Sequence, residues 1–393
     1  MKIYYDTLQH KWSHRQPGEY IWGKERRVLP RSPFSPALSF SVRKQGKRIG
    51  PLVGILTSPG RASFTGNRAT FREIHRALQD RGGILFTFTP QTTVQNRIKG
   101  YVFNDEKRKW IKTDFPYPDV VYNRIPIRAD EEKPPMQSFL KHLESLDIPF
   151  FNAGFLDKWE MYECLRGDPM LIPYLPDTRP SSKSEMQKVL YAWGELFLKP
   201  KAGQKGDNIE ILKQLKDGSI ICRGYNATEH FPNFQELWES RQADLEKISY
   251  LLQKKINLMR MNRRPYDFRI LIQKVSGKWK WTGAGARLAG KNAVTTHVPK
   301  GGTLLSLDEV HPPADLYQLD TICIRAAEQL EKYFAPLCEL SFDIGRDQNG
   351  HYWLFEANAK PMVFDEPDIE AKRMERLLDI FYEKSGFLGT SAI

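Results

Sequence analysis

Two acidic side chains are predicted to face each other near the C-terminal end of the chain. Residues 340–361 read LSFDIGRDQNGHYWLFEANAKP, two apolar runs joined by an Asn-Gly dipeptide that strongly signals a β-hairpin. A two-residue turn at this dipeptide places Asp343 opposite Glu356, and the period of a strand puts Asn358 on the same face. Facing carboxylates repel each other unless a cation or a shared proton compensates them.

A hard divalent cation would relieve this repulsion, because carboxylate and amide oxygens are its preferred ligands. Asp343, Glu356 and Asn358 are therefore predicted to bind a metal, while ordinary solvation of an exposed strand face is the alternative. The other face of the hairpin is predicted to pack in the core, and it carries Phe342, Ile344, Trp353 and Phe355.

Two further features with possible phosphate chemistry lie upstream of the hairpin. A predicted strand at 195–199 runs into Lys199 and a loop with Gly203 and Gly206, where backbone N–H groups could approach phosphate oxygens. Taken alone, a basic glycine loop is more often an ordinary hairpin turn. Arg269 lies in the middle of an apolar strand, which predicts an anionic partner, either a ligand or a structural neighbour near Asp267.

The composition limits the class of protein. The 393-residue chain has room for two or three domains, and 40% hydrophobic with 27% charged residues is typical of a soluble globular protein. There is no apolar run of the length of a membrane span and no signal peptide, so we expect a cytoplasmic protein. The four cysteines form no C-x-x-C pair, which argues against zinc and disulfides. A net charge of +12 favours anionic ligands, but no nucleic-acid-binding motif accompanies it.

The first part of the chain divides into two regions. Residues 1–50 hold aromatic and basic residues broken by prolines, and either a small β module or a docking arm is expected there. In residues 51–153, buried-strand runs alternate with amphipathic helices, which predicts βαβ units around a parallel sheet. Ligands bind such sheets at the carboxyl ends of the strands, so Arg124 is predicted to hold a carboxylate there.

In this order, the glycine–lysine loop, the strand with a central arginine and the acidic hairpin resemble the ATP-grasp superfamily of carboxylate ligases. The segments GILTSPG, YNR, YDFRILI and LFEANAKP are more narrowly similar to the spore-coat-associated YheC/YheD-type proteins of spore-forming bacilli. The resemblance implies an α/β protein, α+β in its ATP-binding part. Its expected parts are an N-terminal extension, a Rossmann-like domain, and N- and C-terminal ATP-grasp subdomains, at residues 1–50, 51–153, 154–258 and 259–393.

The resemblance also implies which residues hold ATP. Lys158 and Lys199 would bind its α- and β-phosphates, and the loop with Gly203 and Gly206 would close over the triphosphate. The backbone of a hinge strand would read the adenine, at Gln253, Lys254 and Ile256. An acidic residue for the ribose hydroxyls is not evident after this hinge.

Catalytic roles follow from the same resemblance. Asp343, Glu356 and Asn358 would bind Mg²⁺ between the β- and γ-phosphates, while Arg269, helped by Arg287, would neutralise the transferred phosphoryl group. The implied reaction turns a carboxylate into an acylphosphate that an amine or thiol attacks, which requires positioning and charge stabilisation rather than a protein nucleophile.

The expected partners are a small-molecule or peptide carboxylate, an amine acceptor and spore-coat proteins, with neither a membrane nor nucleic acid among them. The expected location is the cytoplasm of the mother cell, or the spore coat. A structural or ATP-binding coat component without catalysis is the alternative function.

Overall fold

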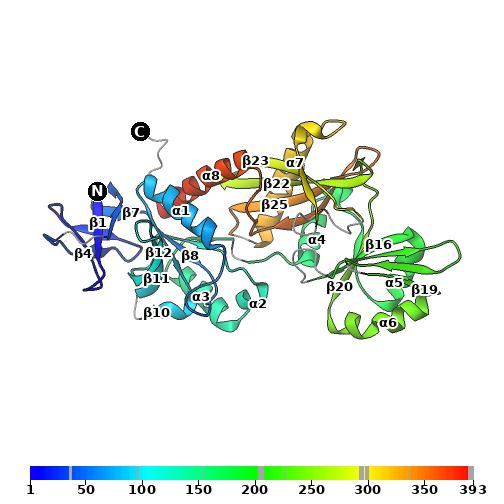
Figure 1. Cartoon of the computed structure of the whole chain (residues 1–393), viewed down its shortest axis with the longest axis horizontal. Helices are drawn as coiled ribbons and strands as arrows, with labels where there is room; N and C mark the ends of the chain where they lie inside the picture. The colour runs from blue at the N-terminus through cyan, green and yellow to red at the C-terminus, as the bar shows by residue number, and fades with distance from the viewer. Residues whose placement is uncertain are drawn as a thin grey trace.

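The computed structural model describes residues 1–34, 38–94, 97–152, 154–201, 208–225, 227–291, 296, 301–334 and 336–387. These residues form an elongated molecule with four groups of strands along its long axis (Figure 1). In chain order they are an N-terminal β module, a parallel sheet, a six-stranded antiparallel sheet with helices α5 (Lys183–Trp193) and α6 (Phe234–Lys247), and a C-terminal sheet. Within the described residues, no helix combines the length and the apolar character that crossing a membrane requires.

The N-terminal β module consists of two small sheets. One contains β1 (Lys2–Asp6), β2 (Lys11–His14) and β5 (Leu38–Ser41), and the other contains β3 (Tyr20–Trp22), β4 (Arg27–Leu29), β6 (Arg43–Gln45) and β7 (Arg48–Gly50). Trp12 and Trp22 pack against Phe115, with ring centroids 5.5 and 6.2 Å apart, and the indole of Trp12 donates to the Asp114 carbonyl at 3.0 Å. The module therefore shares one core with the sheet that follows it.

The parallel sheet is built as the alternating sequence pattern predicts. Its parallel strands lie in the order β9 (Ile84–Phe88), β8 (Leu52–Leu56), β13 (Val120–Asn123) and β14 (Phe150–Phe151), with helices α1 (Arg68–Asp80) and α3 (Pro134–Ser145) in the connections. An antiparallel hairpin that the sequence analysis did not anticipate, β11 (Arg97–Asn104) and β12 (Lys109–Phe115), extends this sheet beyond β9. The start of β11 does alternate, with Arg97 and Lys99 exposed and Ile98 and Gly100 buried, whereas the first half of β12 shows no alternation of buried residues.

The six-stranded antiparallel sheet has the order β15 (Thr178–Pro180), β20 (Tyr250–Lys254), β16 (Glu195–Pro200), β17 (Glu210–Gln214), β18 (Ile220–Arg223) and β19 (Thr228–Phe231). Helix α5 starts where the Ser182 side chain accepts from the Glu185 N–H, and it ends at Gly194, whose φ is 72°. The predicted phosphate loop with Gly203 and Gly206 connects β16 to β17, and these two glycines lie outside the described residues.

The C-terminal sheet has the order β24 (Thr303–Leu305), β23 (Lys278–Leu288), β22 (Arg264–Val275), β25 (Glu339–Arg346) and β26 (Tyr352–Asn358). Helices α4 (Lys158–Arg166) and α7 (Leu316–Phe334) share a core with one face, through residues such as Ile270 and Phe342. Helix α8 (Pro367–Ser385) lies on the other face and also packs on the parallel sheet, so it joins the two sheets.

Candidate active site

A cleft of about 860 Å³ opens where the three sheets of residues 51–387 meet. Its walls come from the first turn of α1, the ends of β16 and β20, and strands β22, β23, β25 and β26. All the described residues that the sequence analysis assigned to ATP, metal or catalysis line this cleft: Lys158, Lys199, Gln253, Lys254, Ile256, Arg269, Arg287, Asp343, Glu356 and Asn358.

The acidic hairpin forms, but with a turn that differs from the predicted one. The N–H of Asp347 donates to the His351 carbonyl at 2.9 Å, so the loop holds three residues instead of two, with Gly350 at a φ of 86°. A β-bulge follows, because Asp343 pairs with Glu356 while Ile344 pairs with Leu354. The two one-residue shifts cancel, and the predicted pairing of Asp343 with Glu356 is confirmed.

The changed turn makes part of the predicted core face wrong. Phe342 and Ile344 are buried as expected, but Tyr352 and Leu354 join them instead of Trp353 and Phe355. Between the turn and the bulge the strand is displaced by one residue, and a one-residue slip moves each side chain to the other face. Phe355 lines the cleft as a result.

Four directly paired residues form a row across the sheet at the floor of the cleft. Glu356 pairs with Asp343, Asp343 pairs with Arg269, and Arg269 pairs with Gly285. Directly paired residues point to the same face, and neighbouring strands lie about 4.8 Å apart. The row therefore places two carboxylates and one guanidinium side by side, and we call it the charged row.

Arg287 is fixed beside the charged row by two carboxylates. Its Nε and Nη2 donate to the two oxygens of Asp267 at 3.0 and 3.1 Å, and its Nη2 lies 3.0 Å from Oδ1 of Asp343. Burial by itself lowers the pKa of Arg287, but the ion pairs outweigh it and raise the pKa above its ordinary value. Arg287 is permanently charged, and its contacts orient Asp343.

The two predicted phosphate-binding lysines lie on the opposite side of the carboxylates from Arg269. Lys158 Nζ lies 3.7 Å from Oε1 of Glu356, and Lys199 Nζ donates to Oε1 of Gln253 at 2.5 Å. Burial, opposed by Glu356 and aided by the nearby Lys158, lowers the pKa of Lys199 to about 8. A phosphate that binds beside a buried ammonium group would stabilise its charge through a charge-assisted hydrogen bond.

The strand that was predicted to read the adenine leads to one backbone N–H that is open to the cleft. The N–H of Lys254 donates to the Asp177 carbonyl at 2.8 Å, and the Gln253 side chain is held between Lys199 and Thr178. The N–H of Ile256 makes no hydrogen bond with another described residue, and Ile256 lines the cleft. The lining residues that directly follow it, Asn257, Leu258, Arg260, Arg263 and Arg264, are neutral or basic.

The loop after β26 is held in place by contacts with residues that follow β13 of the parallel sheet. Arg124, predicted to bind a carboxylate, donates from Nη2 to the Pro361 carbonyl at 3.0 Å and also lines the cleft. The buried Lys360 forms an ion pair with Glu131 and lies 4.4 Å from the ring centroid of Phe155. The sequence analysis missed the Lys360–Glu131 pair, because nothing local links a lysine to a glutamate so distant in the chain.

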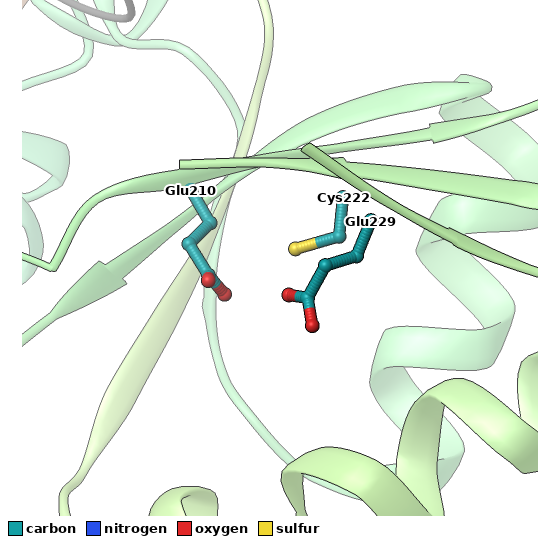
Figure 2. Close-up of side chains that lie close together, drawn as sticks. All are labelled: Glu210, Cys222 and Glu229. Carbon is teal, nitrogen blue, oxygen red and sulfur yellow. The ribbon is translucent and has the colours of Figure 1, made fainter. Parts of the chain in front are cut away.

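A second acidic cluster, away from the cleft, is a salt-bridge cluster. Glu210, Cys222 and Glu229 project from β17, β18 and β19 toward one another (Figure 2), and in the described part of the chain no other group of at least three His, Cys, Asp or Glu side chains is close enough to hold a metal. Arg241 of α6 lies 3.3 Å from Oε1 of Glu210 and forms an ion pair with Glu229. Burial raises the pKa of Cys222 to about 12, so no thiolate is available.

Comparison with known proteins agrees with the geometry of the cleft. Residues 147–388 match the model of the YheC/D-like ATP-grasp family. The chain is 30% identical over 343 residues to the endospore coat-associated protein YheD of Bacillus subtilis (strain 168), covering 82% of this chain and 75% of that protein. It is 26% identical over 293 residues to YheC of the same strain, covering 70% and 78%.

Solved structures share the fold. D-alanyl-alanine synthetase A from Vibrio cholerae O1 biovar eltor str. N16961 superposes with a TM-score of 0.51 at 12% identity, covering 86% of this chain and 98% of that one. The ATP-grasp ligase PsnB, in complex with a minimal precursor, has a TM-score of 0.50 at 14% identity, covering 85% and 99%. The expected ATP-grasp fold is confirmed, and the chain belongs to the YheC/D-like ATP-grasp family.

Proposed function

We propose that this protein is an ATP- and Mg²⁺-dependent ligase that activates a carboxylate as an acylphosphate and joins it to an amine or thiol. The charged row carries the proposal, because it sets two carboxylates beside the guanidinium of Arg269 in a cleft that Lys158 and Lys199 also line. A metal ion would bind the two carboxylates, and the negative charges of a triphosphate would pair with the metal ion, the arginine and the two lysines.

The donor set suits Mg²⁺. Asp343 and Glu356 face each other across β25 and β26, and Asn358 lies two residues beyond Glu356 on the same strand, so three oxygen donors share one region of the cleft. Mg²⁺ accepts such ligands together with phosphate oxygens, and when bound it would neutralise charge on the phosphates. Glu356 also lies beside Lys158, whose Nζ is 3.7 Å from its Oε1.

Arg269 is well placed to stabilise a transferred phosphoryl group. Its Nη2 donates to the Met362 carbonyl at 3.0 Å, and its guanidinium lies 4.4 Å from the ring centroid of Phe364. These contacts fix the side chain and leave other N–H groups for a ligand. Burial lowers the pKa of Arg269, which indicates a partly desolvated cation whose interaction with a phosphoryl oxygen is strengthened.

Hydroxylamine trapping tests the proposed activity. The full-length protein is incubated with Mg²⁺, ATP, hydroxylamine and pools of amino acids and cell-wall precursors, and hydroxamate and ADP are measured together. We expect equimolar hydroxamate and ADP, lost in Glu356→Gln and retained in Glu328→Gln, which changes an exposed glutamate of α7. ADP without hydroxamate from any pool, or equal activity in Glu356→Gln, would contradict the proposal.

A second candidate is an ATP-binding coat component without ligase activity. The names of both curated relatives, which are endospore coat-associated proteins, support association with the spore coat. Tight Mg²⁺-dependent ATP binding without turnover in any pool would favour this candidate. Immunogold labelling of sporulating cells would separate a coat location from a cytoplasmic one.

A further inference from the structure

The charged row ends at Gly285, and a carboxylate from another element lies over this glycine. A Cβ on Gly285 would be 1.8 Å from Oε1 of Glu366, the residue that precedes α8. Gly283 likewise leaves room for α8, because a Cβ there would be 2.7 Å from Cγ1 of Ile369. The two glycines of β23 therefore let the start of α8 lie directly on the sheet, which fixes Glu366 at the end of the row.

Glu366 differs in its partners from the cleft acids carried by strands of the C-terminal sheet. Asp267 and Asp343 are paired with Arg287, and Glu356 is paired with Lys158. The Glu366 side chain is half-buried, lines the cleft, and makes no hydrogen bond or ion pair with a described residue; it does not cap its own helix. A half-buried carboxylate without a hydrogen bond or ion pair would be stabilised by a cation that a ligand brings into the cleft.

The position of Glu366 in the row indicates which cation this is. Glu366 lies over the strand next to Arg269, and the metal-binding carboxylates lie on the two strands beyond Arg269. With strands about 4.8 Å apart, Gly285 lies about 10 Å from Asp343. If Arg269 holds the transferred phosphoryl group, the acyl carbon lies on its far side from the metal, and the acceptor approaches from Glu366.

We propose that Glu366 binds the ammonium group of the acceptor substrate and takes one of its protons; this inference rests on the proposed function. The resulting amine attacks the acylphosphate carbonyl, a C–N bond forms, and the C–O bond to phosphate breaks with its electron pair leaving on phosphate. One ammonium proton passes to Glu366 and then to solvent, and the second leaves with the phosphate.

The surroundings of Glu366 favour an amine over a thiol or a second metal ion. A carboxylate attracts an ammonium group and repels a thiolate. A metal ion would need several oxygen ligands, whereas the neighbours of Glu366 include the apolar Phe364 and Ile369 and the guanidinium of Arg269. The inference thus narrows the acceptor of the proposed ligase to a protonated amine.

Binding of simple amines tests this assignment. Glycinamide and 1,4-diaminobutane, with acetamide and 1,4-butanediol as uncharged analogues, are titrated into the full-length protein by calorimetry, with and without Mg²⁺ and a non-hydrolysable ATP analogue. We expect at least one amine, and neither uncharged analogue, to bind wild type, and its dissociation constant to rise at least tenfold in Glu366→Gln. The matched control Asp368→Asn, an exposed acid in the first turn of α8 that is not among the lining residues of the cleft, changes it less than twofold.

A second variant guards against a folding artefact. In Gly285→Ala the new Cβ displaces Glu366, so we expect the same loss of amine binding, and no further loss when Glu366→Gln is added. Equal amine binding in wild type and Glu366→Gln, or no amine binding to wild type, overturns the inference. Loss of nucleotide or Mg²⁺ affinity in Glu366→Gln assigns the residue to the metal instead, and failure of wild type to bind nucleotide overturns the proposed function separately.

Discussion

Strand β25 carries two carboxylates that differ in their partners. Glu339, at the start of the strand, is fully buried: Arg373 Nε donates to it at 2.9 Å, Gln273 Nε2 donates at 3.3 Å, and the Tyr122 hydroxyl donates as well. Asp343, four residues later, lies at the edge of the cleft beside Glu356. Both carboxylates meet an arginine, but only Asp343 opens onto space that a ligand can enter.

The difference separates a structural charge from a functional one. The partners of Glu339 come from β13, β22 and α8, so the buried network joins the parallel sheet to the C-terminal sheet. Removing one member would leave an uncompensated buried charge. Asp343 and Glu356 are paired with Arg287 and Lys158, but they line the cleft, so a bound metal ion can reach their carboxylates.

Removing the arginine of the buried network should have the largest effect on stability. Arg373→Met leaves Glu339 without its cation, and we expect the free energy of unfolding to fall by about 3–5 kcal/mol in urea denaturation. Lys372→Met, at the exposed position beside it, should change the free energy of unfolding by less than about 0.5 kcal/mol. Similar changes in the free energy of unfolding for the two variants would show that the buried network does not stabilise the contact between the two sheets.

The charged row should show the opposite behaviour. Asp343→Asn keeps the shape of the side chain, and Arg287 keeps both hydrogen bonds to Asp267, so we expect the free energy of unfolding to change by less than about 1.5 kcal/mol. ATP turnover should fall by about 10²–10³-fold, the range seen when a transition-state contact is lost. An unchanged turnover measured by ADP release would break the comparison between the two carboxylates.

Asp119 is an intermediate case, because its contacts only partly compensate its burial. It accepts from Arg48 at 3.1 Å and from the Leu52 N–H at 2.8 Å, yet burial raises its pKa to about 6. The pKa of Asp119 is higher in the folded than in the unfolded protein, so between pH 6 and about 4 the folded protein binds more protons than the unfolded protein does. Protonation of Asp119 therefore increases the free energy of unfolding as the pH falls through that range. Asp119→Asn should remove that contribution, of about 2–3 kcal/mol, from the pH dependence of urea unfolding.

The smallest expected effect concerns the pH dependence of nucleotide binding. The pKa of Lys199 is about 8 without a ligand, and only its charged form attracts phosphate. Affinity for the ATP analogue in the presence of Mg²⁺ should therefore fall about tenfold between pH 7.5 and pH 9 in calorimetry. Lys199→Arg stays charged throughout, so it should abolish this dependence. A pH dependence that persists in Lys199→Arg would assign the titration to another group, such as Lys360.

Local patterns predicted much of the scaffold. The alternation of buried strands and amphipathic helices that was expected within residues 51–153 appears in the structure as β8, α1 and β9, because apolar periodicity reports which face of an element is buried. The acidic hairpin was predicted with the right facing pair through a wrong turn, since the three-residue loop and the bulge at Phe355 offset each other. Loop length and bulges depend on packing around the strand, which periodicity does not report.

The sequence by itself determined the kinds of chemistry available: facing carboxylates, an arginine within an apolar strand, and the order of motifs that indicates the ATP-grasp fold. The tertiary structure alone decided which charges are structural and which are open to ligands. Tyr122 meets Arg373 across 251 residues, Lys360 meets Glu131 across 229, and Glu366 reaches Gly285 because α8 packs back on β23. Such contacts have no local period, because they arise only when separate elements bury their apolar faces against one another.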